Sequence, residues 1–377
     1  MRILLVTEFF PRSDAGEITG GVEARCFYVA KHLRERHDVE VLATPTDGTQ
    51  WDHASFASLP RRLSFLARAV ATGVGKDFDV VEGSNFVVHP VAWLLGALRR
   101  RPVVLYYPDV LLGEWSERFG AIGVVGELVE RAILKLPVAR YLVTAQAVAT
   151  KLTAAGVKDA KITVLPCGFD EEVVGRIRQE NPEASYDVVV VSRLVGYKRV
   201  DLVLRALAQL AGEGPAPRAL VIGRGPEHEA LQRLASELGL ASTVEFRGYV
   251  PHHAEVLRLM ARARVFVSAS EVEGFGIVLV EALALGVPYV ASDIEVFREV
   301  LGNGTGGLLF DPGNVADLAT KLGLLLGDEE LHRAKRQQAL DLSARYTWRR
   351  IARETEALYE RVLAHAGRSP RGEDRQG

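Results

Sequence analysis

Short apolar runs alternate along the chain with segments in which apolar residues recur at helical spacing. This alternation predicts repeated β-α-β units, and therefore largely parallel sheets in an α/β fold. The predicted strands are Ile3–Thr7, Val39–Ala43, Val80–Glu82, Val103–Tyr107, Tyr141–Thr144, Val188–Ser192, Ala219–Gly223, Val244–Arg247, Val265–Ser268 and Tyr289–Ala291. The predicted helices include Val22–Arg36, Val91–Leu98, Asp201–Leu210, Glu227–Leu238, Ala254–Ala261 and Val315–Leu326.

A polar break separates two such halves of the chain. Residues Gly168 to Ser185 carry many charges, and Asn181-Pro182 disfavours a helix there. A length of 377 residues also suits two domains better than a single core. We therefore expect a hinge near Pro166–Asp170 and a second core that starts near Tyr186.

The predicted organisation has four parts. They are a Rossmann-like domain at residues 1–168, a second Rossmann-like domain at residues 186–345, a C-terminal helix at residues 346–366 and a tail at residues 367–377. The helix is expected to pack back on the first domain, and the small, charged tail is expected to be disordered. Open parallel sheets bind ligands beyond the carboxyl ends of their strands, so the loops that follow the strands should line a site between the domains.

Composition narrows the class of protein. Apolar residues make up 48% of the chain and charged residues 25%, as in ordinary globular proteins. A formal charge of −2 gives no reason to expect nucleic acid as a partner. Two cysteines, Cys26 and Cys167, are a poor basis for a disulfide framework or a metal site and fit a reducing cytoplasm. Apolar stretches such as Ile277–Leu285 are too short to span a bilayer, and Glu8 and Pro11 interrupt any signal-peptide core.

Two groups of basic residues allow two interpretations. The groups are Arg99-Arg100-Arg101 and, around Trp348, Arg345, Arg349 and Arg350. The simpler interpretation is that these residues are the solvated ends of helices. The other is peripheral contact with an anionic membrane surface, at the inner membrane face, where cations beside an aromatic side chain would act as an anchor.

Two loops that follow predicted strands carry glycines or cations. Gly20-Gly21 precedes a helix, where backbone N–H groups could meet a phosphate or a sugar hydroxyl; a flexible loop capped by glycine is the alternative. Arg193 and Lys198 follow strand Val188–Ser192. Cations placed there would stabilise the charge that develops on a diphosphate leaving group, whereas the alternative is ordinary solvated charges.

A third segment is the most specific. The helix from Gly276 to Leu285 is apolar on nearly every face and should be buried. Glu281 is therefore an isolated carboxylate, whose burial costs several kcal/mol unless it is hydrogen-bonded or paired. Its partner is either a ligand hydroxyl, which Gly274 and Gly276 would leave room for, or another side chain of the protein. Backbone N–H groups of the first turn could also hold phosphate oxygens.

Two other interpretations of these residues are less favourable. Glu273 and Glu281 would lie about 12 Å apart along a helix axis, beyond the spacing of about 5–9.5 Å that glycosidase carboxylates need. Gly223 and Gly225 match half of a dinucleotide-binding fingerprint, but His228 occupies the place of the third glycine.

Taken together, these motifs resemble the GT-B-fold glycosyltransferases of family 4, also called glycosyl transferases group 1. The most specific match is the Glu-x7-Glu pair of Glu273 and Glu281. Arg193 and Lys198 match the Arg-Leu…Lys loop of the family, and Gly20-Gly21 matches its N-terminal glycine loop. The segment Val164–Asp170 matches the hinge, with Cys167 in place of the usual asparagine.

The resemblance implies two Rossmann-like domains that face each other across a cleft. It implies transfer of a sugar from a nucleotide-diphosphate donor, with retention of configuration and with no metal or other cofactor. Arg193, Lys198 and Glu273 would be catalytic, with the cations on the diphosphate and Glu273 beside the sugar. Glu281 would accept hydrogen bonds from the ribose. The donor-binding candidates are Gly20, Gly21, Gly223, Tyr249, Val250, Gly274, Phe275, Gly276, Ile277 and Glu281.

The chain departs from the family where histidines usually follow the third and fourth strands. Glu82, Asn85 and Asp109 occupy this region and are candidates for contact with the acceptor, which is expected to be a small molecule, a glycan or a lipid-linked molecule. His89 is expected to begin a helix and to be structural. Two alternatives to a transferase remain: an epimerase or hydrolase on the same scaffold, and a non-catalytic nucleotide-sugar binding protein.

Overall fold

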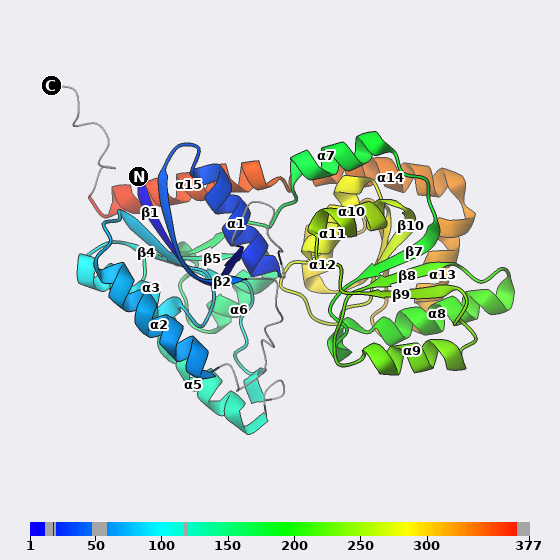
Figure 1. Cartoon of the computed structure of the whole chain (residues 1–377), viewed down its shortest axis with the longest axis horizontal. Helices are drawn as coiled ribbons and strands as arrows, with labels where there is room; N and C mark the ends of the chain where they lie inside the picture. The colour runs from blue at the N-terminus through cyan, green and yellow to red at the C-terminus, as the bar shows by residue number, and fades with distance from the viewer. Residues whose placement is uncertain (12–17, 19, 47–58, 117–119, 368–377) are drawn as a thin grey trace. The chain divides into compact units, whose positions relative to one another are not determined.

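The computed structural model describes residues 1–11, 18, 20–46, 59–116 and 120–367 (Figure 1). The chain divides into two compact units, of which unit 1 contains Met1–Cys167 and the segment from Trp348, and unit 2 contains Gly168–Thr347. Residues 368–377, where the sequence predicts a disordered tail, lie outside the described residues.

Unit 1 is built on a parallel sheet of six strands in the order β2-β1-β3-β4-β5-β6. The strands are β1 (Arg2–Pro11), β2 (Asp38–Thr46), β3 (Val80–Gly83), β4 (Val103–Tyr107), β5 (Arg140–Val143) and β6 (Ile162–Val164). The helices include α1 (Gly21–Leu33), α2 (Leu59–Val74), α3 (His89–Arg99), α5 (Gly123–Leu134), α6 (Gln146–Ala154) and α15 (Trp348–His365). Helix α15 packs against α1, and α2 packs against α3 (Figure 1).

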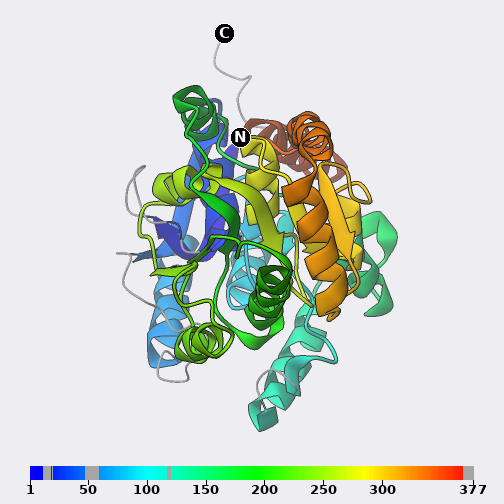
Figure 2. The same cartoon turned by 90° about the vertical axis from the view of Figure 1, so that its right-hand side faces the viewer.

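Unit 2 repeats this plan with a parallel sheet in the order β12-β11-β10-β7-β8-β9. The strands are β7 (Tyr186–Val191), β8 (Ala219–Ile222), β9 (Val244–Gly248), β10 (Ala263–Ser268), β11 (Tyr289–Ser292) and β12 (Gly307–Phe310). The helices are α7 (Glu171–Glu180), α8 (Val200–Glu213), α9 (His228–Glu237), α10 (His253–Ala261), α11 (Ile277–Leu285), α12 (Glu295–Val300), α13 (Val315–Gly327) and α14 (Glu329–Ser343). Helix α8 packs with α9 and α13, whereas α10 and α11 pack with α7 (Figure 2).

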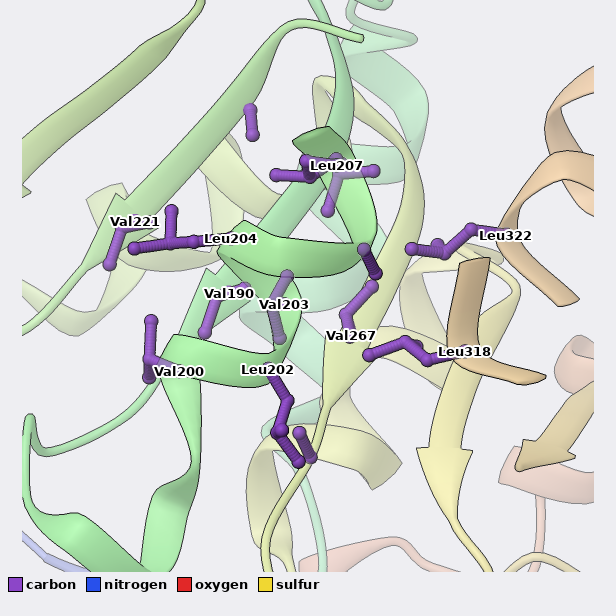
Figure 3. Packing of buried hydrophobic residues seen from close by; sticks show 14 of the residues in the cluster. Val190, Val200, Leu202, Val203, Leu204, Leu207, Val221, Val267, Leu318 and Leu322 are labelled. Atoms are coloured by element: carbon purple, nitrogen blue, oxygen red, sulfur yellow. The ribbon is translucent and has the colours of Figure 1, made fainter. Parts of the chain in front are cut away.

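The core of unit 2 shows why its sequence forms these elements. Val200, Leu204 and Leu207 recur at helical spacing along α8 and are buried against the sheet (Figure 3). Val190 and Val221 of the neighbouring strands β7 and β8 complete this layer. The apolar runs of the strands are continuous because a parallel sheet is covered on both faces.

Sheet order determines which loops meet at the carboxyl edge. In unit 2 the chain runs from β7 to β8 to β9 on one side, and β10 then pairs on the other side of β7. Ligand sites in such sheets lie where the strand order reverses. The loops after β7 and β10 therefore meet at this point, although they are far apart in the sequence. In unit 1 the corresponding loops follow β1 and β3.

The segment predicted as a polar break contains a helix, α7. Asp170 caps its first turn by accepting backbone N–H hydrogen bonds at 3.0 and 3.1 Å. Val174 and Ile177 bury one face of the helix, which packs on α10 and α11. Asn181 ends the helix in the left-handed conformation, with φ of 43°. Unit 2 therefore begins at Gly168 and not near residue 186.

Trp348 is a core residue and not a surface anchor. Its side chain is 1% exposed, and its ring stacks on that of Tyr28 with 5.5 Å between the ring centroids. The membrane interpretation of the arginines around Trp348 is therefore wrong in this respect. Arg99, from the other basic group, donates a hydrogen bond to the carbonyl of Val74, as expected for the end of a helix. No helix in the described part of the chain is long and apolar enough to cross a membrane.

Candidate functional site

Two of the predicted catalytic residues meet where the strand order of unit 2 reverses. The ammonium of Lys198, in the loop after β7, contacts the carboxylate of Glu273, in the loop after β10. Their side chains are 12% and 18% exposed. Ser270 donates a hydrogen bond to the same oxygen of Glu273 at 3.1 Å. Sheet topology, and not proximity in the sequence, thus builds this ion pair.

Tyr197 connects the cations of this loop and was missed by the sequence analysis. Its ring centroid lies 5.9 Å from the guanidinium carbon of Arg193 and 5.6 Å from the ammonium nitrogen of Lys198. Its hydroxyl accepts a hydrogen bond from Arg193, and its carbonyl accepts the backbone N–H of Glu271 at 2.9 Å. Tyr197 therefore holds the loop after β7 against the loop after β10.

Two glycines bring the loop after β8 against the loop that carries Arg193. A Cβ atom on Gly223 would lie 1.8 Å from the carbonyl oxygen of Ser192, and one on Gly225 would lie 2.1 Å from that of Leu194. This close backbone approach explains the half fingerprint without a dinucleotide. Contact of Gly223 with a donor stays a prediction.

Glu281 lies inside α11 and is 4% exposed. Its Oε1 atom lies 2.7 Å from Nε2 of His253, and its Oε2 atom has no hydrogen-bond partner among the described residues. An ionised carboxylate only accepts hydrogen bonds, so Nε2 of His253 carries the proton. One oxygen of Glu281 thus has a protein partner, whereas the other is buried and has none among the described residues, so its contact with a ligand stays a prediction. His253 was not among the site residues predicted from the sequence.

The N-terminus of α11 is formed by the predicted glycine segment. Gly276 precedes the helix with φ of 86°, a left-handed conformation that favours glycine. The N–H group of Leu279 donates to the carbonyl of Gly276 at 3.0 Å, whereas the N–H groups before it, from Ile277, have no acceptor within the helix, as at any helix N-terminus. Phe275 corrects the prediction in part: its side chain is 5% exposed and packs against Tyr346, so it belongs to the core, and only its backbone could meet a donor.

The predicted nucleobase contacts follow β9. Gly248 at the end of the strand has φ of 71°, and Tyr249 and Val250 come directly after it and are half-buried. The guanidinium of Arg224, from the loop after β8, lies 4.0 Å from the ring centroid of Tyr249. Tyr249 therefore lies beside the loop after β8, and the contact of Tyr249 and Val250 with a base stays a prediction.

Glu82 corrects the predicted acceptor side. It is fully buried in unit 1, where its Oε2 atom accepts hydrogen bonds from Arg25 at 3.2 Å and from the hydroxyl of Tyr359 at 2.7 Å. A carboxylate with no exposed surface cannot touch an acceptor in this structure. Glu82 is the last residue but one of β3, and its hydrogen bond with Tyr359 places its side chain between the sheet and α15.

The other acceptor-side candidates lie near strand ends of unit 1. Asp109 follows β4 and accepts a hydrogen bond from the ammonium of Lys151 at 2.9 Å. Asn85 follows β3 and lies 3.5 Å from Oε2 of Glu8, whose other oxygen accepts a hydrogen bond from Arg62 at 2.6 Å. Burial raises the pKa of Glu8, against the effect of Arg62. Glu8 was not named as a candidate, although it comes directly after the predicted strand Ile3–Thr7.

His89 and the glycine loop complete unit 1. His89 begins α3, as predicted, and is buried with its Nε2 atom 3.0 Å from the carbonyl of Tyr106. Burial lowers the pKa of His89 to about 3, so the ring is neutral near pH 7. Gly20 caps α1, which begins at Gly21; residues 12–17 and 19 of the same loop lie outside the described residues.

Two family models match the chain, one after the other. The model described as Glycosyltransferase Family 4 matches residues 19–173, and the model described as Glycosyl transferases group 1 matches residues 175–341. Together they account for most of both sheets. The chain belongs to the family 4 glycosyltransferases. The resemblance inferred from the Glu273–Glu281 motif is therefore confirmed.

Relatives of this family 4 glycosyltransferase carry different names. An exopolysaccharide phosphotransferase of Streptomyces coelicolor is 28% identical over 93% of this chain and 40% of its own length. A GDP-mannose-dependent alpha-(1-6)-phosphatidylinositol monomannoside mannosyltransferase of Mycolicibacterium smegmatis is 36% identical over 50% of this chain and 52% of its own length. The chain thus spans about half, or less, of the length of these relatives.

A solved structure shows the same fold. The structure of HepE from Anabaena, in complex with UDP and glucose, has a TM-score of 0.74 and 22% identity, and the likeness covers 96% of this chain and 100% of that one. The predicted fold class, GT-B with two Rossmann-like sheets, is therefore confirmed. Within the described ranges of this glycosyltransferase, no group of three or more His, Cys, Asp or Glu side chains could hold a metal ion.

Proposed function

We propose that this protein transfers a sugar from a nucleotide-diphosphate donor to an acceptor. The observation that carries the proposal is the ion pair of Lys198 with Glu273 at the carboxyl edge of the unit 2 sheet, with Arg193 beside Tyr197 in the same loop. When the bond between the sugar and the diphosphate breaks, negative charge develops on the leaving oxygen. Fixed cations beside that oxygen stabilise the transition state more than the ground state.

Each remaining candidate has a role in this proposal. Arg193 and Lys198 bind the diphosphate, and the N-terminus of α11 adds backbone N–H groups to its oxygens. Because Glu273 holds Lys198 in the structure, the diphosphate would replace that carboxylate as a partner of the ammonium. Glu273 would then lie beside the sugar, the free oxygen of Glu281 beside the ribose, and Tyr249 and Val250 beside the base. The reaction retains configuration and uses cations in place of a metal.

A panel of donors and acceptors tests the proposal. The protein is incubated with UDP-glucose, UDP-N-acetylglucosamine or GDP-mannose, with and without sugar and lipid-linked acceptors. We expect release of nucleoside diphosphate that depends on the acceptor and persists in EDTA, and a product whose anomeric configuration, measured by NMR, equals that of the donor. Product without an acceptor would favour a hydrolase or epimerase. Release of nucleoside monophosphate would instead indicate transfer of a sugar phosphate.

We also propose that the acceptor is lipid-linked and is met at an anionic membrane surface, on the cytoplasmic side. The support is an exposed aliphatic face on α5, where Val125 is 60% and Leu128 is 64% exposed. Arg131 and Lys135, near the end of this helix, would meet anionic lipid headgroups. The Mycolicibacterium relative is named a phosphatidylinositol monomannoside mannosyltransferase, which is consistent with this proposal.

Vesicles test the membrane contact separately from transfer. We expect the protein to sediment with vesicles that contain phosphatidylglycerol, and Leu128→Ser together with Val125→Ser to reduce the bound fraction severalfold by loss of apolar burial. Leu324→Ser, at a side chain of α13 that is 47% exposed, is the matched control and should leave binding unchanged. Equal binding of all three proteins would refute the α5 contact and leave the transfer proposal intact.

A further inference from the structure

His253 is placed where it can control the acceptor strength of Glu281. It is the first residue of α10, a helix that packs on α11 and on α7. Its Nε2 atom is hydrogen-bonded to one oxygen of the Glu281 carboxylate, at 2.7 Å. The second oxygen has no hydrogen-bond partner among the described residues. Glu281 is 4% exposed, so this second oxygen is a buried polar atom that needs a hydrogen-bond donor from elsewhere.

The charge on His253 depends on its carboxylate neighbours. Burial and the N-terminal position in α10 both disfavour an imidazolium. Burial lowers the pKa of His253, but Glu281 and the more distant carboxylate of Asp170, which caps α7, outweigh it, so the pKa is raised overall. At the far end of α7, Glu180 is bound by Arg258 of α10 at 3.2 Å. The charged groups that act on the ring of His253 are thus the carboxylates of Glu281 and Asp170.

We propose that His253 is a positioning residue for the donor nucleotide. It holds Oε1 of Glu281 and cancels the charge of the carboxylate, so that Oε2 is fixed as the acceptor for a ribose hydroxyl. This inference rests on the proposed function, because it assumes that Glu281 meets the ribose of a nucleotide. It adds a residue of unit 2 that lies outside the Glu273–Glu281 motif.

The charge of the pair has a consequence for nucleotide binding. With an imidazolium the pair is neutral, and a diphosphate can bind nearby without repulsion. When His253 loses its proton, a buried negative charge remains at Glu281, near a ligand that is itself an anion. Because the pKa of His253 is raised, the neutral pair persists above the usual titration range of histidine and is lost as the pH rises further. Nucleotide affinity should therefore fall as the pH rises.

Calorimetric titration with UDP and with GDP, between about pH 6 and pH 9, measures this effect. For the wild type we expect the dissociation constant of the preferred nucleotide to rise about fivefold across this range, beyond the change seen in His253→Gln. The glutamine amide can replace the hydrogen bond of Nε2 but carries no charge, so this variant should bind at all pH values without the extra slope. His253→Ala should bind the nucleotide at least about fivefold more weakly than the wild type, because Glu281 loses its hydrogen-bond partner.

The matched control is His332→Gln in α14. The ring of His332 lies 2.9 Å from the carbonyl of Arg264, away from the Glu281 pair, so this variant should keep the slope of the wild type. Equal slopes for the wild type and His253→Gln would overturn the charge role. A His253→Ala variant that melts earlier but binds nucleotide as the wild type does would overturn the positioning role and leave His253 as a structural residue.

A deoxynucleotide separates this inference from the proposed function. The wild type should bind 2′-deoxy-UDP or 2′-deoxy-GDP about tenfold more weakly than the ribonucleotide, since a hydrogen bond to a charged carboxylate is lost. Equal affinity would remove Glu281 from the ribose and overturn the inference about His253. Sugar transfer would still be judged by acceptor-dependent release of nucleoside diphosphate, which does not depend on this contact.

Discussion

Replacement of Lys198 by alanine is expected to lower the turnover of sugar transfer about 100-fold to 1,000-fold, the loss typical of one preorganised electrostatic contact. The ammonium of Lys198 is held in place by Glu273 and lies near Tyr197, with only 12% of the side chain exposed. A cation in such a site is poorly screened by water, and it needs no reorganisation when charge develops on the leaving diphosphate. The measurement is the turnover number for release of nucleoside diphosphate at saturating donor.

Two comparisons show whether the loss is catalytic. Arg233→Ala in α9 removes a cation whose side chain is 68% exposed, so its turnover should equal that of the wild type. The thermal stability of Lys198→Ala is measured as well, and turnover is compared at a temperature at which the variant is folded, because removing one partner of a mostly buried pair can itself destabilise the protein. Turnover that is unchanged in Lys198→Ala would refute the assigned role of this residue.

The strands were predictable from the sequence because a covered parallel sheet needs continuous apolar runs. Val103–Tyr107 was predicted with the bounds that β4 has in the structure, and other strand bounds differ by a few residues. The edge strands β6 and β12 were missed. Ile162–Val164 is short and half-buried, so its apolar pattern is weak. Helix α7 was missed because the many charges around it concealed Asp170 as a cap and Val174 and Ile177 as a buried face.

The candidate site was predictable only in part. Lys198 and Glu273 could be named because they belong to motifs that are local in the sequence. Their contact depends on the order of the strands, which periodicity does not contain. Tyr197 and His253 carry no such motif. The role of Tyr197 becomes visible only when β7 and β10 are paired, and that of His253 only when α10 is packed on α11. A buried glutamate in an apolar helix predicts a partner but does not say which residue it is.

Glu82 shows the opposite error. An acidic residue in a strand, in a region where the family often has histidine, was interpreted as a contact for the acceptor. Its partners Arg25 and Tyr359 lie 57 and 277 positions away in the sequence, so no local pattern could have indicated them. The structure instead indicates a buried ion pair that joins the sheet of unit 1 to α15, which can be tested by stability.

We expect Glu82→Ala to lower the free energy of unfolding by about 3–5 kcal/mol, the usual cost of breaking a buried pair. The substitution leaves Arg25, whose side chain is 1% exposed, without its carboxylate. Burial disfavours the charge of Arg25, and Glu82 raises its pKa against that effect. A guanidinium does not escape the loss by releasing its proton near pH 7. Urea denaturation measures the change.

Two further variants identify the cause of this loss. Tyr359→Phe removes only the hydroxyl that donates to Glu82 and should cost about 1.5–3 kcal/mol, as for a hydrogen bond to a charged group. Glu354→Ala breaks an exposed pair with Arg350 on the same helix, and its effect should stay below about 1 kcal/mol. If Glu82→Ala kept the stability of the wild type and raised the KM for the acceptor, Glu82 would belong to the acceptor site. A large loss of stability, with an unchanged KM in the protein that remains folded, would instead assign Glu82 to the attachment of α15.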